Sequence, residues 1–260
     1  MEGKISNWIK KGRSYYKNGQ YENALEMFNE VLKIYPNNIT VLNKVGSIYY
    51  ALNNLTEALN IYNNLRSLCK RLGLLEKEKA VLEKIGRIYS LQGKYSIAIK
   101  IYLEALEIYD QIEPAEIKPQ EEKLLLLYNV GDLYKRQKDY DQALSLYKQL
   151  LQIHSEFGPL GGIADDLAEI GGILQKQKNF TEALNKFKEA LQIYKVEKTL
   201  SKTTIILFEI GKVYYKINQY PEALIYLNEA LKNFKKLGLR EPDDYYYRKT
   251  KDLIKIIKKG

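Results

Sequence analysis

Small and large apolar residues recur along this chain with one fixed spacing. In six places a glycine is followed twelve residues later by an alanine, and large apolar residues stand three after the glycine, three before the alanine and four after it. The six pairs are Gly12 with Ala24, Gly46 with Ala58, Gly86 with Ala98, Gly131 with Ala143, Gly171 with Ala183, and Gly211 with Ala223. Because offsets of three and four place side chains on one face of a helix, each unit predicts two amphipathic helices.

A short polar turn separates the two predicted helices of each unit. In the first unit Asn18 and Gly19 precede the second helix, which is predicted over 21–35, and Pro36 closes the unit. Glycine within a helix costs about 1 kcal/mol relative to alanine. The repeated glycines therefore indicate that two helix backbones approach closely at these positions.

The first unit carries residues that resemble the signature of the tetratricopeptide repeat family. These residues are Trp8, Gly12, Tyr15, Ala24, Phe28 and Pro36. Lys11 stands where the family usually has leucine, and the later units lack the closing proline. The resemblance extends over 5–237, and the spacing of about forty residues between the later units is similar to that of the long-helix subgroup of the family.

The resemblance implies an all-α fold, a right-handed superhelical solenoid of six helix-turn-helix repeats. The repeats are expected at about 5–38, 39–72, 79–112, 124–157, 164–197 and 204–237. Between the third and fourth repeats, Pro114 and Pro119 predict an irregular loop. The segment 243–260 is expected to be a basic capping helix over the last repeat, and the alternative is a basic amphipathic helix that lies on an anionic membrane.

The charge of the chain is concentrated near its C-terminal end. The net charge is +9, from 41 lysines and arginines against 32 acidic residues, and the segment 245–260 alone carries +5. The remaining chain is nearly balanced, and its interspersed charges argue against nucleic-acid binding. No apolar run has the length of a signal peptide or of a membrane span. We therefore expect a soluble cytoplasmic protein that contacts a membrane surface at most through its basic C-terminal helix.

Residues with catalytic or metal-binding chemistry are sparse. Cys69 and His154 are the only residues of their types, which excludes an internal disulfide and metal sites that need several thiols or imidazoles. We interpret Cys69 as a buried or idle thiol, His154 as structural or exposed, and the carboxylate pairs Glu121–Glu122 and Asp165–Asp166 as solvated. The sequence contains no phosphate-binding glycine loop and no nucleophile elbow. We expect no enzyme activity, no metal and no cofactor.

In the tetratricopeptide family the first helices of the repeats line a concave groove, so the resemblance implies a groove at fixed offsets from each glycine. The residues expected to bind a partner there are Lys10, Arg13, Tyr16, Lys17, Lys44, Tyr50, Lys84, Arg87, Asn129, Asp132, Lys135 and Arg136. The first three repeats contribute mainly cations, whereas the last three are mixed in charge. Asn129 and Asp132 are similar to a polar pair of the long-helix subgroup.

We hypothesise that the N-terminal half of this groove binds an acidic or carboxylate-bearing segment. Arg13 and Arg87 would anchor carboxylates in bidentate fashion. Tyr16 and Tyr50 would add apolar contact with a polar tip. The alternative is that these cations only keep the surface solvated.

The function that follows from the resemblance is a non-catalytic scaffold or adaptor that binds a peptide or partner segment. Two alternatives stay open. One is an assembly chaperone for a membrane complex, for example a photosynthetic one, which docks through the basic C-terminal helix. The other is a regulatory module of a phosphorelay or transferase system. The sequence leaves the identity of the partner and the oligomeric state open.

Overall fold

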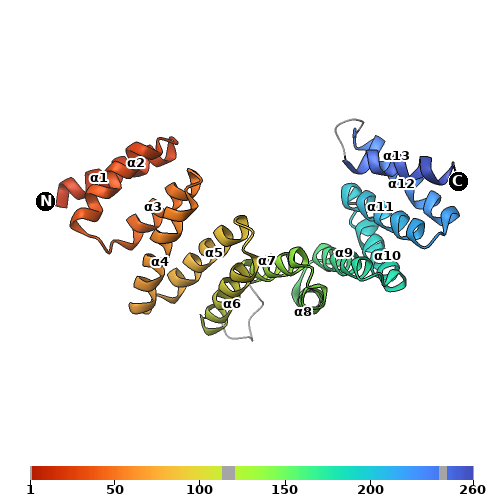
Figure 1. Cartoon of the computed structure of the whole chain (residues 1–260), viewed down its shortest axis with the longest axis horizontal. Coiled ribbons are helices and arrows are strands. Elements are labelled where there is room, and N and C mark those ends of the chain that lie inside the picture. The colour runs from red at the N-terminus through yellow and green to blue at the C-terminus, as the bar shows by residue number, and fades with distance from the viewer. Residues whose placement is uncertain (1, 113–120, 240–244, 260) are drawn as a thin grey trace. The chain divides into compact units, whose positions relative to one another are not determined.

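The computed structural model describes residues 2–112, 121–239 and 245–259, and every regular element in them is an α-helix (Figure 1). The expected all-α class is therefore confirmed. The helices are α1 (Glu2–Lys17), α2 (Tyr21–Ile34), α3 (Ile39–Ala51), α4 (Leu55–Arg71), α5 (Leu75–Leu91), α6 (Tyr95–Ile112), α7 (Glu121–Gln137), α8 (Tyr140–Phe157), α9 (Leu160–Lys176), α10 (Phe180–Val196), α11 (Leu200–Lys216), α12 (Tyr220–Lys236) and α13 (Tyr245–Ile257). The loop predicted around Pro114 and Pro119 lies outside the described residues.

Within each part of the chain, helices that are neighbours in sequence pack against each other. The chain divides into two compact units, Met1–Leu133 and Tyr134–Gly260, which we call unit 1 and unit 2. In unit 1, α1 packs with α2, α3 with α4, and α5 with α6. In unit 2, α9 packs with α10, α11 packs with α12, and α13 covers α12 and part of α11. This packing is that of an α-solenoid of about six helical hairpins and a capping helix.

The turns inside the hairpins contain a left-handed backbone residue, and in three of them the next residue caps the second helix with its side chain. Asn53 has a φ of 57°, and the following residue, Asn54, accepts a hydrogen bond from the Glu57 backbone nitrogen at 3.3 Å. In the first hairpin Gly19 takes the left-handed position, with a φ of 72°. Asparagine and glycine adopt this conformation with the least strain, and an asparagine cap satisfies a free amide at the helix start. The polar turn residues therefore set where each hairpin reverses.

The repeated glycines Gly12, Gly46, Gly86, Gly171 and Gly211 each lie under a large side chain from the second helix. A Cβ atom on Gly46 would lie 2.6 Å from Tyr62 Cε1, and one on Gly171 would lie 2.7 Å from Phe187 Cδ1. Tyr62 and Phe187 each stand four residues after the repeated alanine. The sequence interpretation of a backbone-to-backbone approach therefore needs correction, because at these positions a ring takes the space that a Cβ would fill.

His154 and Asp166 form a buried pair between α8 and α9. Asp166 is completely inaccessible, and its Oδ2 lies 2.6 Å from Nδ1 of His154. A Cβ on Gly162 would lie 2.8 Å from Cδ2 of His154, so this glycine makes room for the imidazole. The prediction that Asp166 is solvated is wrong, because the packing of α9 on α8 turns this carboxylate inward.

The last helix, α13, uses its apolar face to cover the end of the array. The ring of Tyr246 lies 5.5 Å from that of Phe208 on α11, in an edge-to-face arrangement. The ring of Tyr247 lies 6.5 Å from that of Phe234 on α12. Ile254 is buried in the same interface. No helix in the described part of the chain is long and apolar enough to cross a membrane.

Gly171 and Gly172 provide a matched test of the glycine–ring contact. A Cβ on Gly172 would meet no heavy atom within 4 Å, so Gly172→Ala should raise the free energy of unfolding by up to about 1 kcal/mol through helix propensity. Gly171→Ala should lower it by about 1–3 kcal/mol because Phe187 must shift. Thermal and urea denaturation followed by circular dichroism would measure both effects. Equal stability of the two variants would contradict a packing role for Gly171.

The pair His154–Asp166 should behave as a coupled unit. We expect Asp166→Ala to lower the free energy of unfolding by about 3 kcal/mol, because it removes a buried carboxylate from the imidazole that faces it. The same substitution should cost at least about 1 kcal/mol less in a His154→Ala background. Urea denaturation of the two single variants and the double variant completes the cycle. Strictly additive losses would show that the two side chains do not interact.

Candidate partner-binding site

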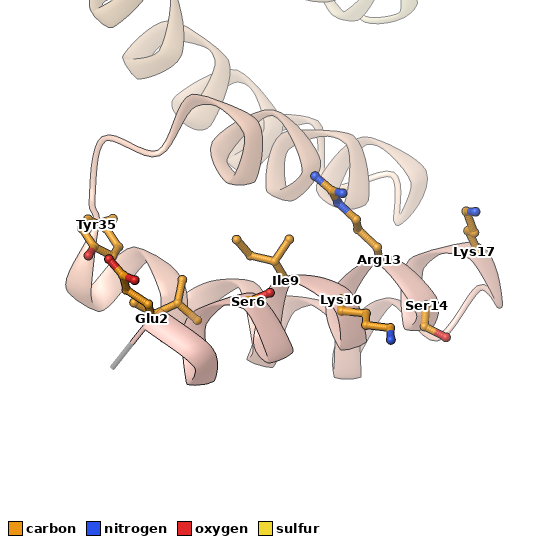
Figure 2. A pocket seen from close by; sticks show the side chains of 9 residues that line it. Glu2, Ser6, Ile9, Lys10, Arg13, Ser14, Lys17 and Tyr35 are labelled. Atoms are coloured by element: carbon orange, nitrogen blue, oxygen red, sulfur yellow. The ribbon is translucent and has the colours of Figure 1, made fainter.

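The first helices of unit 1 carry a connected surface of cations, tyrosines and small polar residues. We call it the unit 1 face, and it consists of Lys10, Arg13, Tyr16 and Lys17 on α1, Asn43, Lys44, Ser47 and Tyr50 on α3, and Lys84 and Arg87 on α5. Along α1, Lys10, Arg13 and Lys17 line a groove of about 660 Å³. Figure 2 shows Arg13 and Lys17 extending to one side of α1 and Lys10 to the other. None of these three cations forms an ion pair with a carboxylate in the described residues.

Lys44 connects α3 to α1 through an aromatic contact. Its Nζ lies 4.8 Å from the ring centroid of Tyr16, which is within cation–π range. Lys44 and Tyr16 are both half-buried. Two of the residues predicted from the sequence therefore form one local contact between neighbouring hairpins.

Lys84 connects α5 to α3 within the unit 1 face. Its Nζ donates a hydrogen bond to Asn43 Oδ1 at 2.6 Å and lies 5.4 Å from the ring centroid of Tyr62. Burial lowers the pKa of Lys84, and the ammonium group of Lys44 lowers it further, while Glu83 opposes the shift. The two lysines therefore repel each other in a partly desolvated position, where charge interactions are stronger than in water.

Tyrosines from the second helices lie against the same first-helix residues, although their side chains are almost fully buried. The hydroxyl of Tyr62 lies 3.1 Å from Ser47 Oγ, and burial raises the pKa of Tyr62. Burial also raises the pKa of Tyr102 to about 12, although Arg87 opposes this shift. Both phenols are therefore neutral at pH 7 and can donate hydrogen bonds.

The sequence-based site contained only first-helix residues, and so did not include these second-helix tyrosines. A signal was present four residues after the repeated alanine, where tyrosine stands in three repeats and phenylalanine or leucine in the others. The hydroxyl distinguishes a ring that only packs from one whose tip also reaches the surface. Asn43 was missed because it stands three residues before Gly46, outside the offsets that the resemblance implies for the groove. Ser47 stands at one of those offsets, directly after Gly46, but was not among the residues expected to bind.

Asn129 joins Lys84 and Arg87 at a second cleft of unit 1. The cleft has a volume of about 450 Å³ and is also lined by Tyr102 and Glu83. Burial raises the pKa of Glu83, and the nearby charge of Glu122 adds to the shift. This end of the unit 1 face therefore combines cations with carboxylates, unlike the part on α1 and α3.

The other predicted residues have separate surroundings. Tyr50 is half-buried on α3, and Asp132 is exposed on α7. Lys135 belongs to unit 2, where its Nζ pairs with Glu169 and lies 5.1 Å from the ring centroid of Tyr147. Arg136 lines a groove of unit 2. The predicted set is thus divided between the two units, with ten of its members in unit 1.

The described residues offer little for catalysis or metal binding. No group of three histidine, cysteine or acidic side chains in them is arranged to hold a metal ion. Cys69 is buried, and burial raises the pKa of its thiol despite the nearby charge of Lys77. A thiol with a raised pKa carries less of the reactive thiolate at neutral pH.

Helical hairpins stacked in chain order, with polar and charged residues on their first helices, define the class of α-solenoid interaction proteins. Family models agree with this class. The model described as "Tetratricopeptide repeat" matches residues 37–111, 122–195 and 163–236, and the model described as "TPR repeat" matches residues 12–53. The chain belongs to the tetratricopeptide repeat family, and the resemblance expected from the sequence is confirmed.

Individual relatives share parts of the sequence or the whole fold. The TPR repeat-containing protein MJ1428 of Methanocaldococcus jannaschii is 36% identical over 84 residues, a match that covers 30% of this chain and only 15% of that protein. The apo form of RapI superposes with a TM-score of 0.69 at 18% identity and covers 97% of this chain and 85% of its own. A signal-transduction ATPase with a tetratricopeptide repeat sensor from Pyrococcus horikoshii, PH0952, gives 0.72 at 15% identity and covers 99% of this chain and 39% of its own. At these identities the structural likenesses show the fold alone.

Tetratricopeptide repeats typically mediate protein–protein interactions and are usually non-catalytic. No catalytic domain is evident in the residues that the structure describes. Protein partners are therefore expected in general terms, and the chemistry of the partner has to be argued from the surfaces of this chain.

The charged form of Lys84 should lower the free energy of unfolding of the protein. We expect Lys84→Met to raise the free energy of unfolding at pH 7 by about 1 kcal/mol, because it removes a partly buried cation that repels Lys44. With a pKa below its ordinary 10.5 in the folded state, Lys84 binds fewer protons there than in the unfolded chain between the two values. The difference in the free energy of unfolding between Lys84→Met and the wild type should therefore shrink as the pH rises toward 10.5.

Urea denaturation at several pH values would measure this difference, with Lys70→Met on the exposed surface of α4 as the control. The control should change stability by less than about 0.5 kcal/mol. A large loss of stability in Lys84→Met would contradict the view that Lys84 is retained for binding.

Proposed function

We propose that this chain is a protein-interaction module whose unit 1 face binds an acidic or carboxylate-bearing segment of a partner protein. The observation that carries the proposal is the pair Lys44 and Lys84. Both side chains are half-buried, each lies over a tyrosine ring, and Lys84 is hydrogen-bonded to a neutral amide rather than to a carboxylate. A bound carboxylate would relieve the repulsion between the two lysines and replace part of the water that they lost on folding.

Arg13 and Arg87 extend the positive surface on either side of this pair. Both residues are exposed. A guanidinium group matches the geometry of a carboxylate with two parallel hydrogen bonds. The hydroxyls of Tyr62 and Ser47 supply neutral hydrogen-bond donors between the charged groups.

The competing interpretation treats the cations as a solvated surface. It suits Lys10 and Lys17, which are exposed. It does not explain Lys84, because a lysine that serves only solubility would stay fully hydrated. Burial beside another lysine costs free energy without improving solubility. The electrostatic cost at Lys84 therefore favours a binding role.

Docking on a membrane complex through α13 is the main alternative. The apolar face of α13 packs on Phe208 and Phe234. That face is therefore used within unit 2, and an amphipathic insertion of this helix into a lipid surface would require its release. No observation on the described residues specifically favours a phosphorelay or transferase module.

A peptide-binding measurement tests the proposal. The probe is a fluorescein-labelled octapeptide of alternating glutamate and serine, which we call the glutamate–serine peptide. Fluorescence anisotropy with the full chain should show binding that weakens as salt rises and screens the charges. The double variant Lys44→Glu/Lys84→Glu should weaken binding at least about tenfold, and Arg13→Glu/Arg87→Glu about fivefold.

The matched control is Lys70→Glu/Lys100→Glu, which makes the same charge change at exposed positions on α4 and α6 of unit 1. This variant should bind the peptide within twofold of the wild type. An equal loss in the control and in Lys44→Glu/Lys84→Glu would reduce the effect to net charge and would overturn the proposal. Unchanged binding in both double variants of the unit 1 face would overturn it as well.

A further inference from the structure

Unit 2 contains a groove to which the site expected from the sequence contributes only Lys135 and Arg136. It has a volume of about 820 Å³ and is lined by α9, α11, the end of α7 and the helix α13. Its apolar lining includes Ile173, Ile205 and Phe208 from the first helices of the repeats. Tyr245 and Tyr246 of α13 line the same groove. The capping helix therefore also forms part of a concave surface.

The charge around this groove is predominantly positive. Its lining includes Arg136, Lys138, Lys176, Lys212, Lys216 and Lys249. Among the described residues its lining includes two carboxylates, Glu169 and Glu209, and these pair with Lys135 and Lys212. The carboxylates of the mixed charge expected for the last three repeats are thus paired within the protein. The remaining cations give the groove its positive charge.

Lys216 shows that these cations are crowded. Burial lowers the pKa of Lys216, and the ammonium groups of Lys212 and Lys176 lower it further, while Glu209 opposes the shift. Nζ of Lys216 lies 5.9 Å from the ring centroid of Phe180. Lys176, Lys212 and Lys216, from α9 and α11, all line the groove, and Glu209 pairs with Lys212.

Helix α13 adds aromatic surface and a further cation to the same groove. The rings of Tyr245 and Tyr246 meet edge to face, with centroids 5.5 Å apart, and Tyr246 is held in turn by Phe208. The side chain of Tyr245 is 58% exposed. The groove that this ring lines has apolar residues at its base. Nζ of Lys249 lies 5.9 Å from the ring centroid of Tyr245.

We propose that this groove is a second docking site, separate from the unit 1 face, which takes an acidic peptide segment that carries an aromatic or aliphatic anchor. The apolar base and the exposed ring of Tyr245 would receive the anchor, and Lys176, Lys216 and Lys249 would pair with the flanking carboxylates. In this arrangement α13 is a wall of the site as well as a cap. The inference shares with the proposed function only the assumption of a protein partner, and it rests on different residues.

Charge complementarity and the apolar base together favour a peptide over other anionic partners. A nucleic acid backbone or a lipid headgroup would satisfy the lysines but would leave an apolar base beside phosphate groups. A peptide can alternate carboxylates with apolar side chains, so that each part of the groove meets a matching group.

Two peptides of equal length and charge test the proposal. The first is the glutamate–serine peptide, and the second, which we call the anchored peptide, replaces two of its serines with phenylalanine and leucine. We expect the full chain to bind the anchored peptide at least tenfold more tightly than the glutamate–serine peptide. This affinity gain should fall below threefold in Lys216→Glu/Lys249→Glu.

The controls separate this site from the unit 1 face. Lys232→Glu/Lys255→Glu makes the same charge change at exposed positions on α12 and α13 outside the groove, and it should keep the gain. Lys44→Glu/Lys84→Glu should also keep the affinity gain, although this variant binds the glutamate–serine peptide more weakly than the wild type does. If Lys44→Glu/Lys84→Glu kept the affinity gain but bound the glutamate–serine peptide as tightly as the wild type, the proposed function would be overturned. If it weakened binding of the glutamate–serine peptide but also lost the affinity gain, this inference would be overturned.

A milder variant and a competition complete the test. Tyr245→Ser changes an exposed ring, so the fold should survive, and the gain should drop at least threefold. Hydrogen–deuterium exchange should show protection of α13 and α11 by the anchored peptide. A gain that is unchanged in both Lys216→Glu/Lys249→Glu and Tyr245→Ser would overturn the inference. So would displacement of the anchored peptide by oligothymidylate or phosphatidylglycerol vesicles at equal charge concentration.

Discussion

The contact between a glycine backbone and a large side chain from the second helix is the constraint on which each hairpin depends. At Gly12, Gly46, Gly86 and Gly171 a ring carbon stands within 2.7 Å of the place where a Cβ would be. This contact sets the separation of the two helices. Since a helix pair cannot bury its apolar surface alone, the separation in turn sets how the next pair stacks on it.

The same contact also determines which groups lie against the first-helix residues of the unit 1 face. Where the side chain over the glycine is tyrosine, its ring packs in the hairpin while its hydroxyl meets the first-helix face, as Tyr62 does at Ser47. In unit 2 the corresponding residues include Phe187 and Leu227, which carry no hydroxyl. One packing position therefore makes the unit 1 face polar between its cations and leaves the unit 2 groove more apolar.

Crowded lysines are the second theme common to both units. Lys84 meets Lys44 across α5 and α3, and Lys216 meets Lys212 and Lys176 across α11 and α9. In both places burial lowers the pKa of the lysine, which means that the folded state holds a charge that it would be more stable without. Such costs are typical of surfaces kept for binding, because an anionic partner offsets them when it docks.

Residue spacing along the chain was sufficient to predict the helical hairpins and the helix faces that carry Arg13, Lys44 and Lys84, but not that a ring rather than a backbone meets the repeated glycines. A spacing of three or four residues determines which side chains share a helix face, and this depends only on local geometry. Which surface that face meets was decided by packing between hairpins. Only the tertiary structure could therefore place Asp166 beside His154, bring the hydroxyl of Tyr62 to the unit 1 face, and lay α13 along the groove of unit 2.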